Sequence, residues 1–347
     1  GVAPVVEPLV VDEIERGHTA APASPRGQLS GRAVANGAEW HRWDAVRAPG
    51  ISSAHEAIRL ADIVADSRPD VAVLHSSKAG LAGRLAIRGK IPTVFVPHAW
   101  SFQAVSGATR LFAESWERFA IRWTHRLVCM CDDELARGRG RRIAAPGVVI
   151  RNGIDLDRFA PRDQHTARRD LGLVEGPTVV CVGRLAHQKG QDVLLRAWPS
   201  VRERLPEANL ILVGDGPERE NLRRAAPDGV EFAGARDDTQ NWFAAADVVA
   251  VPSGWETMSL VALEAMASGR PVVASAFDGA ADCLGGSGEV VPIGDHVALA
   301  DGLVRYLTGS PAGLAAEGAK ARELATRTGD YRQSTERWND LLRSLAG

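Results

Sequence analysis

The chain has 347 residues, 45% of them hydrophobic, which is enough for two domains of ordinary size. Its formal net charge of −2 at pH 7 excludes a molecule that binds nucleic acid through an overall positive charge. The four cysteines are scattered, and Cys129 and Cys131 have no second ligand pair nearby, so we expect neither a disulfide framework nor a zinc site.

The sequence shows no apolar run of about 18 residues and no signal-peptide pattern, so we expect a cytoplasmic protein. Residues 1–150 hold a slight excess of basic residues, which would suit an anionic lipid surface or acceptor. Peripheral contact with the inner face of a membrane therefore stays open.

The first segment, 2–16, has apolar residues at helical spacing, and Gly17 follows it. An α/β domain normally opens with a strand, then a glycine turn, then such a helix. We therefore expect that the first strand of this domain is absent and that Gly1 belongs to its first turn.

Short apolar runs then alternate with helical patterns along the whole chain. The runs are mostly apolar, as buried parallel strands are, and they predict strands at 70–77, 91–98, 126–131, 148–154, 178–183, 208–214, 230–234, 247–253 and 271–275. Helices are predicted at 53–67, 78–89, 111–126, 191–205, 221–226, 239–246 and 260–269.

This alternation predicts an α/β protein with two doubly wound parallel sheets. The stretch 149–161 mixes turn residues, so we place the domains at 1–148 and 149–327. A last amphipathic helix is expected within 328–347.

Ligands bind beyond the carboxyl ends of the strands in open α/β sheets, so polar residues there are candidates for function. The loop 183–190 (GRLAHQKG) begins at Gly183 and places Arg184 and Lys189 directly after a strand. Two fixed cations at this point could hold a diphosphate. An ordinary solvated loop is the alternative.

Two glycine patterns are near misses. The segment 213–219 (VGDGPER) nearly matches the dinucleotide fingerprint, but Arg219 stands at its third glycine, which weakens the case for NAD. Loop 183–190 misses the P-loop pattern, because Gln188 stands where glycine is required.

The segment 252–275 carries the strongest signal. A strand ends at its start, a polar turn with Glu256 follows, and a helix that contains Glu264 begins around Ser259. The two carboxylates could reach different parts of one extended ligand. The helix mouth favours a phosphate through backbone amides, namely those of Thr257, Met258, Ser259 and Leu260. Alternatively, Glu256 caps the helix and Glu264 is solvated, although the apolar neighbours of Glu264 argue against this.

Three further residues follow predicted strands. His98 could hydrogen-bond a sugar hydroxyl or a phosphate, although a single histidine is more often structural. Lys78 occupies a similar place. Loop 232–238, which contains Arg236, could contact a nucleobase, and a surface turn is equally consistent with it. Asp155 and Asp157 form a D-x-D pattern without neighbouring acidic ligands, which indicates a turn rather than a metal site.

Taken together, the segments KAGLAGRLA, PHAWSF, VVIRNGIDLDRF, GRLAHQKG, LVGDGPER, AAADVVAVPS and ETMSLVALEAMASGRPVVAS resemble the retaining glycosyltransferase family 4. The similarity covers nearly the whole chain in the right order. The first half is similar to members that build capsular, exopolysaccharide or glycolipid chains. The resemblance implies a GT-B fold, in which two Rossmann-like domains face a central cleft that binds the nucleotide sugar.

The resemblance also implies roles for the donor-side residues. In the family, the cations that match Arg184 and Lys189 hold the diphosphate. The glutamate that matches Glu264 binds the ribose hydroxyls, and the one that matches Glu256 faces the donor sugar. The family often has Gly-Phe-Gly where this chain has residues 257–259, a change that keeps the backbone amides but puts sugar selectivity in doubt.

On the other side, the histidine that matches His98 lies against the reacting sugar. Gly1 and Lys78 are assigned to the acceptor side. Transfer with retention needs no metal or other cofactor in this family, and the leaving phosphate can take the acceptor proton. The resemblance therefore implies transfer from a UDP- or GDP-linked sugar to a glycan or lipid-linked acceptor.

Four other functions remain in competition. A GT-B sugar-nucleotide epimerase or a glucan synthase would share the fold. A two-domain NAD-dependent dehydrogenase would show NADH binding, and a binding-only module would show no sugar transfer or donor hydrolysis.

Overall fold

The computed structural model describes residues 2–46 and 52–347, and the chain forms two compact units. The first unit runs up to Asn152 and also includes the last helix, Tyr331–Gly347, whereas the second unit is Gly153–Asp330. No helix of the described ranges is long and apolar enough to cross a lipid bilayer.

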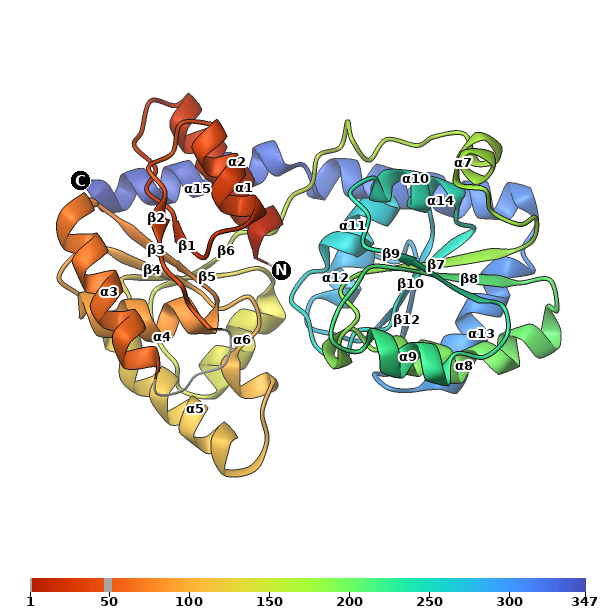
Figure 1. The fold of residues 1–347 in the computed structure, drawn as a ribbon, viewed down its shortest axis with the longest axis horizontal. Helices are drawn as coiled ribbons and strands as arrows, with labels where there is room; N and C mark the ends of the chain where they lie inside the picture. Colours follow the sequence, from red (N-terminus) through yellow and green to blue (C-terminus); the bar gives the residue numbers. More distant parts are fainter. Residues whose placement is uncertain (1, 47–51) are drawn as a thin grey trace. The chain divides into compact units, whose positions relative to one another are not determined.

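The first unit has a four-stranded parallel sheet in the order β3-β4-β5-β6 and a two-stranded parallel pair, β1-β2 (Figure 1). The strands are β1 (Ala23–Ser24), β2 (His41–Arg42), β3 (Ala72–His75), β4 (Thr93–Val96), β5 (Arg126–Cys129) and β6 (Gly147–Val149). The strands of the four-stranded sheet confirm those predicted in this half. Strand β4 is buried along its whole length, as an inner parallel strand should be.

The helices of the first unit include the predicted opening helix, which the structure places at α1 (Ala3–Glu15). The others are α2 (Gln28–Ala35), α3 (Ser52–Ser67), α4 (Ser76–Ile87), η1 (Ser101–Gln103), α5 (Gly107–Ala120), η2 (Ile121–Trp123), α6 (Asp132–Gly140) and α15 (Tyr331–Ala346). Gly1, assigned to the first turn, lies outside the described residues.

The second unit has a six-stranded parallel sheet in the order β12-β11-β10-β7-β8-β9. Its strands are β7 (Thr178–Val182), β8 (Asn209–Val213), β9 (Val230–Gly234), β10 (Val248–Val251), β11 (Val272–Ser275) and β12 (Glu289–Val291). The chain runs outward from β7 to β9 and then returns to β10 beside β7. The boundary between β7 and β10 is therefore the topological switch point, where sheets of this kind bind their ligands.

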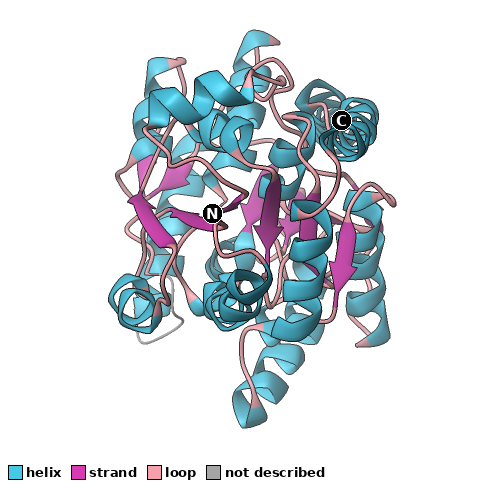
Figure 2. Ribbon diagram, turned by 90° about the vertical axis from the view of Figure 1, so that its right-hand side faces the viewer, coloured by secondary structure: helices cyan, strands magenta, loops and turns pink. Residues whose placement is uncertain are grey.

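Helices cover both faces of this sheet (Figure 2). They are α7 (Gln164–Leu171), η3 (His187–Lys189), α8 (Gln191–Arg204), α9 (Arg219–Ala225), α10 (Thr239–Ala245), α11 (Leu260–Ala267), α12 (Ala280–Leu284), α13 (His296–Leu307) and α14 (Pro311–Thr328). In Figure 1, α8, α9 and α13 lie on one face, and α10, α11 and α14 lie on the other. The fully buried Trp198 and Leu194 of α8 pack with strand residues such as Leu210, and this burial stabilises the sheet.

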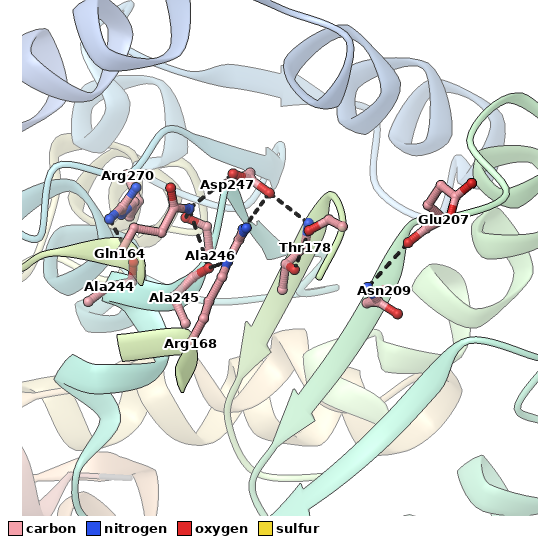
Figure 3. A network of polar contacts seen from close by, with 11 residues as sticks. Gln164, Arg168, Thr178, Glu207, Asn209, Ala244, Ala245, Ala246, Asp247 and Arg270 are labelled. Carbon is pink, nitrogen blue, oxygen red and sulfur yellow. Dashed lines mark hydrogen bonds and ion pairs between the residues drawn. The ribbon is translucent and has the colours of Figure 1, made fainter. Parts of the chain in front are cut away.

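A polar network ties down the amino-terminal edge of the same sheet (Figure 3). The Asp247 carboxylate, just before β10, accepts hydrogen bonds from the Thr178 amide at 2.7 Å, from Arg168 at 2.7 Å and from Gln164 at 3.0 Å. Because these partners come from α7 and from the start of β7, the network fixes helix α7 and strands β7 and β10 at that edge. The opposite, carboxyl edge of β7 and β10 carries the polar loops that the sequence singled out.

Candidate functional site

The loops that follow β7 and β10 are joined to each other at the switch point. Gly190 has φ +66°, and a Cβ atom there would lie 2.0 Å from the Pro252 carbonyl oxygen, so only glycine permits this approach. The Gln188 side chain donates to the Trp255 carbonyl at 3.0 Å, and the Gly254 amide donates to the Gln188 carbonyl at 2.9 Å. Gln188, which breaks the P-loop pattern, thus serves to connect the two loops.

Lys189 and Glu256 meet across these loops. Their side chains, 21% and 11% exposed, form an ion pair between Lys189 Nζ and Glu256 Oε1. The aliphatic part of Lys189 lies beside Gly183. Glu256 Oε2 is buried and has no hydrogen-bond partner among the described residues, which leaves a strong acceptor for a ligand hydroxyl.

A small pocket opens beside this pair at the ends of β7 and β10. Its lining includes Val182, Lys189, Gln191, Ser253 and Ser259. Backbone from two neighbouring strands, a cation and two hydroxyls therefore surround one space at the switch point. The Lys189 ammonium at this point could pair with an anionic group such as a phosphate that lies against the loops.

Burial shifts the pKa values of two charged residues of the second unit, Lys189 and Glu264. It lowers the pKa of Lys189 to about 8, while Cys181 and the carboxylate of Glu264 oppose the shift. It raises the pKa of Glu264 to about 7, while Arg158 and Lys189 oppose that shift. Near neutral pH, Lys189 is mostly charged and Glu264 titrates.

Helix α11 begins as predicted at its Ser259 cap, whose Oγ accepts from the Ala262 amide. The residue before the cap, Met258, is buried and has φ +53°, a conformation that costs an L residue free energy. Its amide donates to the Asp278 carbonyl at 3.3 Å. Of the four amides assigned to a phosphate, that of Met258 is therefore already engaged within the unit. Thr257 is buried and Leu260 is half-buried at the same turn.

The other two predicted cations are on the surface. Arg184 is exposed directly after Gly183. Arg236 is exposed and turned back onto its own loop, where it donates to the Ala233 carbonyl at 3.0 Å and lies 5.7 Å from the Trp242 ring. Arg236 would have to swing out of this contact to reach a ligand.

The first unit contains a histidine pair that the sequence did not indicate. His75 ends β3, His98 follows β4, and His75 Nδ1 lies 3.0 Å from His98 Nε2. Burial lowers the pKa of His75 to about 4 and that of His98 well below its ordinary value. His75 lay within the predicted strand 70–77, and its position next to a second strand end was the signal that could have marked it.

Lys78 is held inside the first unit. Its Nζ lies 2.6 Å from Glu56 and donates to Ser53 Oγ at 2.9 Å, and both charged side chains are largely buried. Burial by itself would raise the pKa of Glu56, but hydrogen bonds from Lys78 and from the Val46 amide lower it. These contacts give Lys78 a structural partner, and its acceptor role stays a prediction.

Asp155 is a turn residue, as predicted. Its carboxylate accepts hydrogen bonds from the amides of Asp157 at 3.0 Å and Arg158 at 2.9 Å. Within residues 2–46 and 52–347, the His, Cys, Asp and Glu side chains form no group of three or more that could hold a metal ion.

In comparisons with known proteins, both halves of the chain match glycosyltransferase family models. A model described as "Glycosyltransferase Family 4" matches residues 14–158, and one described as "Glycosyl transferases group 1" matches residues 176–309. The chain is 37% identical over 208 residues to the GDP-mannose-dependent alpha-(1-6)-phosphatidylinositol monomannoside mannosyltransferase of Mycolicibacterium smegmatis, which covers 55% of this chain and 54% of that protein.

A second relative is the UDP-Gal:alpha-D-GlcNAc-diphosphoundecaprenol alpha-1,3-galactosyltransferase of Escherichia coli, 30% identical over 238 residues that cover 64% of this chain and 62% of that protein. The chain thus spans about half to two thirds of the length of the curated relatives that it matches. Among solved structures, Anabaena Alr3699/HepE in complex with UDP and glucose superimposes with a TM-score of 0.82 at 21% identity, covering 99% of this chain and 96% of that one.

The fold and the family matches thus agree along the chain. Parallel α/β units of Rossmann type, a switch-point site in the second unit and solved neighbours with the GT-B fold accompany the two family matches. The chain belongs to glycosyltransferase family 4, with a group 1 glycosyl transferase domain in its second unit.

Proposed function

We propose that this chain transfers a hexose from a UDP- or GDP-linked sugar to a glycan or lipid-linked acceptor, with retention and without a required metal, in the assembly of a polysaccharide or glycolipid. One observation carries the proposal: at the switch point of the second unit, Lys189 lines a small pocket together with Ser259 at the start of helix α11, and it forms an ion pair with Glu256. The mannosyltransferase and galactosyltransferase named above, which use GDP- and UDP-linked sugars, support the donor class.

The pocket suggests how the donor is bound. The diphosphate takes the place of Glu256 as the partner of Lys189, and the exposed Arg184 adds a second cation from the same loop. Glu256, released from the ion pair, offers both carboxylate oxygens to hydroxyls of the donor sugar. Glu264 accepts hydrogen bonds from the ribose hydroxyls in its charged form.

The same contacts support the reaction itself. As the bond between the sugar C1 and the phosphate oxygen breaks, negative charge accumulates on the leaving diphosphate, and Lys189 and Arg184 stabilise it. The acceptor hydroxyl forms the new bond to C1, and its proton passes to an oxygen of the leaving phosphate. The neutral His98 ring hydrogen-bonds the donor sugar and holds C1 in position.

Helix α5 of the first unit supplies a surface for a lipid-linked acceptor. Leu111 and Phe112 on this helix are 66% and 74% exposed. Next to them, Arg110, Arg118 and Arg141 share the single Glu114 carboxylate, which leaves excess positive charge. An exposed apolar ridge beside arginines favours contact with an anionic membrane surface.

A donor screen tests this proposal. Calorimetry with UDP, GDP, ADP and NADH, with and without a metal chelator, should show selective binding of one nucleoside diphosphate in both conditions. Assays of sugar release and transfer with the matching nucleotide sugar then separate a transferase from a binding-only module. Binding of NADH without any diphosphate would replace the proposal with a dehydrogenase, and interconversion of the free nucleotide sugar would replace it with an epimerase.

A further inference from the structure

Two neighbouring strands of the first unit end in histidines that contact each other. Strands β3 and β4 are paired in parallel with His75 opposite Val96, and His98 follows two residues after that register position. The imidazole rings are stacked, with centroids 5.3 Å apart and an angle of 28° between their planes. His75 Nδ1 and His98 Nε2, 3.0 Å apart, are at hydrogen-bonding distance.

The backbone around the pair adopts an unusual conformation. Ser76, His98 and Ala99 have φ values of +83°, +49° and +80°, a region that residues with a Cβ atom seldom adopt. Such residues persist only where their surroundings hold them, and they occur most often at functional sites.

One buried carboxylate supplies part of that support. Glu134 Oε1 accepts from the Ala99 amide and Oε2 accepts from the Met130 amide, both at 2.8 Å. The Glu134 carbonyl also accepts from the Trp100 indole at 2.8 Å. The start of α6 therefore fixes the two residues that directly follow His98.

The last helix also contacts His75. Trp338 of α15 is 2% exposed, and its ring centroid lies 5.8 Å from that of His75. His75 thus contacts both the Trp338 indole and the His98 imidazole, and these contacts favour one orientation of its ring.

The contact between the rings has a chemical consequence. Both imidazoles are partly buried and are neutral at neutral pH, so each carries one N–H and one acceptor nitrogen. If His75 Nδ1 donates, His98 must carry its own hydrogen on Nδ1. If His98 Nε2 donates, its Nδ1 is an acceptor. The state of His75 therefore decides whether His98 offers a donor or an acceptor to a ligand.

We infer that His75 is a positioning residue, which sets the orientation and the tautomer of the His98 ring through their contact. Trp338 in turn holds His75 in place. This inference rests on the proposed function, in which His98 hydrogen-bonds the donor sugar. It adds that transfer requires a hydrogen-bonding nitrogen of residue 75 within reach of His98 Nε2.

The test compares two amides. In His75→Asn, the amide takes the place of the imidazole Nδ1, whereas in His75→Gln it lies one bond further out and no longer faces His98 Nε2. We expect His75→Asn to keep kcat within about threefold of the original protein and His75→Gln to lose about 10-fold, as for one hydrogen bond. The affinity for the nucleoside diphosphate, whose contacts lie in the second unit, should change less than about twofold in both.

A control and a second measurement separate positioning from stability. His125 accepts from the Thr93 amide at 3.1 Å at the other end of the same sheet, so His125→Asn and His125→Gln should show no such difference in kcat. Nitrogen-15 NMR of the histidine rings, with His98 assigned from a His98→Gln spectrum, should show one His98 tautomer in the original protein and in His75→Asn, and a changed ratio in His75→Gln.

The outcomes are distinct. Equal kcat values for the Asn and Gln variants in an active enzyme, or an unchanged His98 tautomer in His75→Gln, would overturn the inference and leave the proposed function intact. Failure of the original protein to use any nucleotide sugar would overturn the proposed function. The NMR comparison needs no substrate and still tests whether His75 controls His98.

Discussion

Replacement of Lys189 by alanine is the most direct test of the donor pocket. If the ammonium replaces its bond to Glu256 with a bond to the diphosphate, the variant loses one charge-assisted contact, about 1.5–3 kcal/mol of binding. At about 1.4 kcal/mol for each tenfold change, the dissociation constant of the preferred nucleoside diphosphate should rise roughly 10- to 150-fold. With a pKa of about 8, Lys189 is mostly charged at pH 7, so the full effect should appear there.

Loss of the lysine also affects the folded state. Glu256 would keep a largely buried carboxylate without its partner, and breaking a buried pair in this way costs about 3–5 kcal/mol of stability at most, and less here because Lys189 is one-fifth exposed. The double variant Lys189→Ala with Glu256→Gln removes that charge and should recover part of the lost stability while leaving binding weak.

The assay is calorimetric titration at pH 7 together with thermal unfolding. The matched control is Lys320→Ala, because Lys320 is exposed and its pair with Glu317 joins successive turns of α14, an arrangement worth only a few tenths of a kcal/mol. A folded Lys189→Ala protein with the same nucleotide affinity and the same kcat/KM as the control would refute the pocket assignment.

Further predictions concern pH, the loop junction and the lipid surface. Burial raises the pKa of Glu264 from 4.5 to about 7, so the Glu264 carboxyl destabilises the folded state increasingly as the pH rises from about 4.5 to 7. In thermal unfolding scans across that pH range, Glu264→Gln should therefore gain stability relative to the original protein. Gly190→Ala should lower the free energy of unfolding by more than the roughly 1–3 kcal/mol of backbone strain, as measured by urea titration, whereas Gly294→Ala, with similar φ but open space at its Cβ, should show the strain alone. Phe112→Ser should reduce sedimentation with anionic vesicles, whereas Val174→Ser, at a residue of the second unit that is also 74% exposed, should not. Equal effects of the two substitutions would show that α5 is not the lipid-binding surface.

The main strands could be read from the sequence because buried parallel strands are continuous apolar runs. Strand β10 and the predicted run 247–253 differ only at their ends. Strand β12 (Glu289–Val291) escaped because three residues after a glycine-rich turn give no pattern, and β1 and β2 are shorter still. The predicted strand 148–154 is too long, since β6 ends at Val149 before the turn to the second unit.

The site residues were harder to predict than the strands. The end of a predicted strand shows where a polar side chain lies along the sheet, but not which other side chain it contacts. The loop positions of Lys189 and Glu256 followed from the sequence, but their ion pair depends on the close approach at Gly190. Lys78 has the same kind of position, yet its contact with Glu56 comes from another helix. The partner of His98 required the strand register and a left-handed turn, neither of which the sequence alone shows.

The polar groups at the strand ends differ in charge between the two units, and the difference matches the two tasks of the proposed reaction. In the second unit, Lys189 and Glu256 form a largely buried ion pair, so a diphosphate can replace the carboxylate as the partner of Lys189 at little cost in unpaired charge. In the first unit, His75 and His98 lose their protons on burial and stay neutral. A neutral ring can hydrogen-bond a sugar without competing for the diphosphate. A charged residue at 98 should therefore hinder transfer by drawing the leaving group, so we expect His98→Lys to reduce kcat more than His98→Gln does.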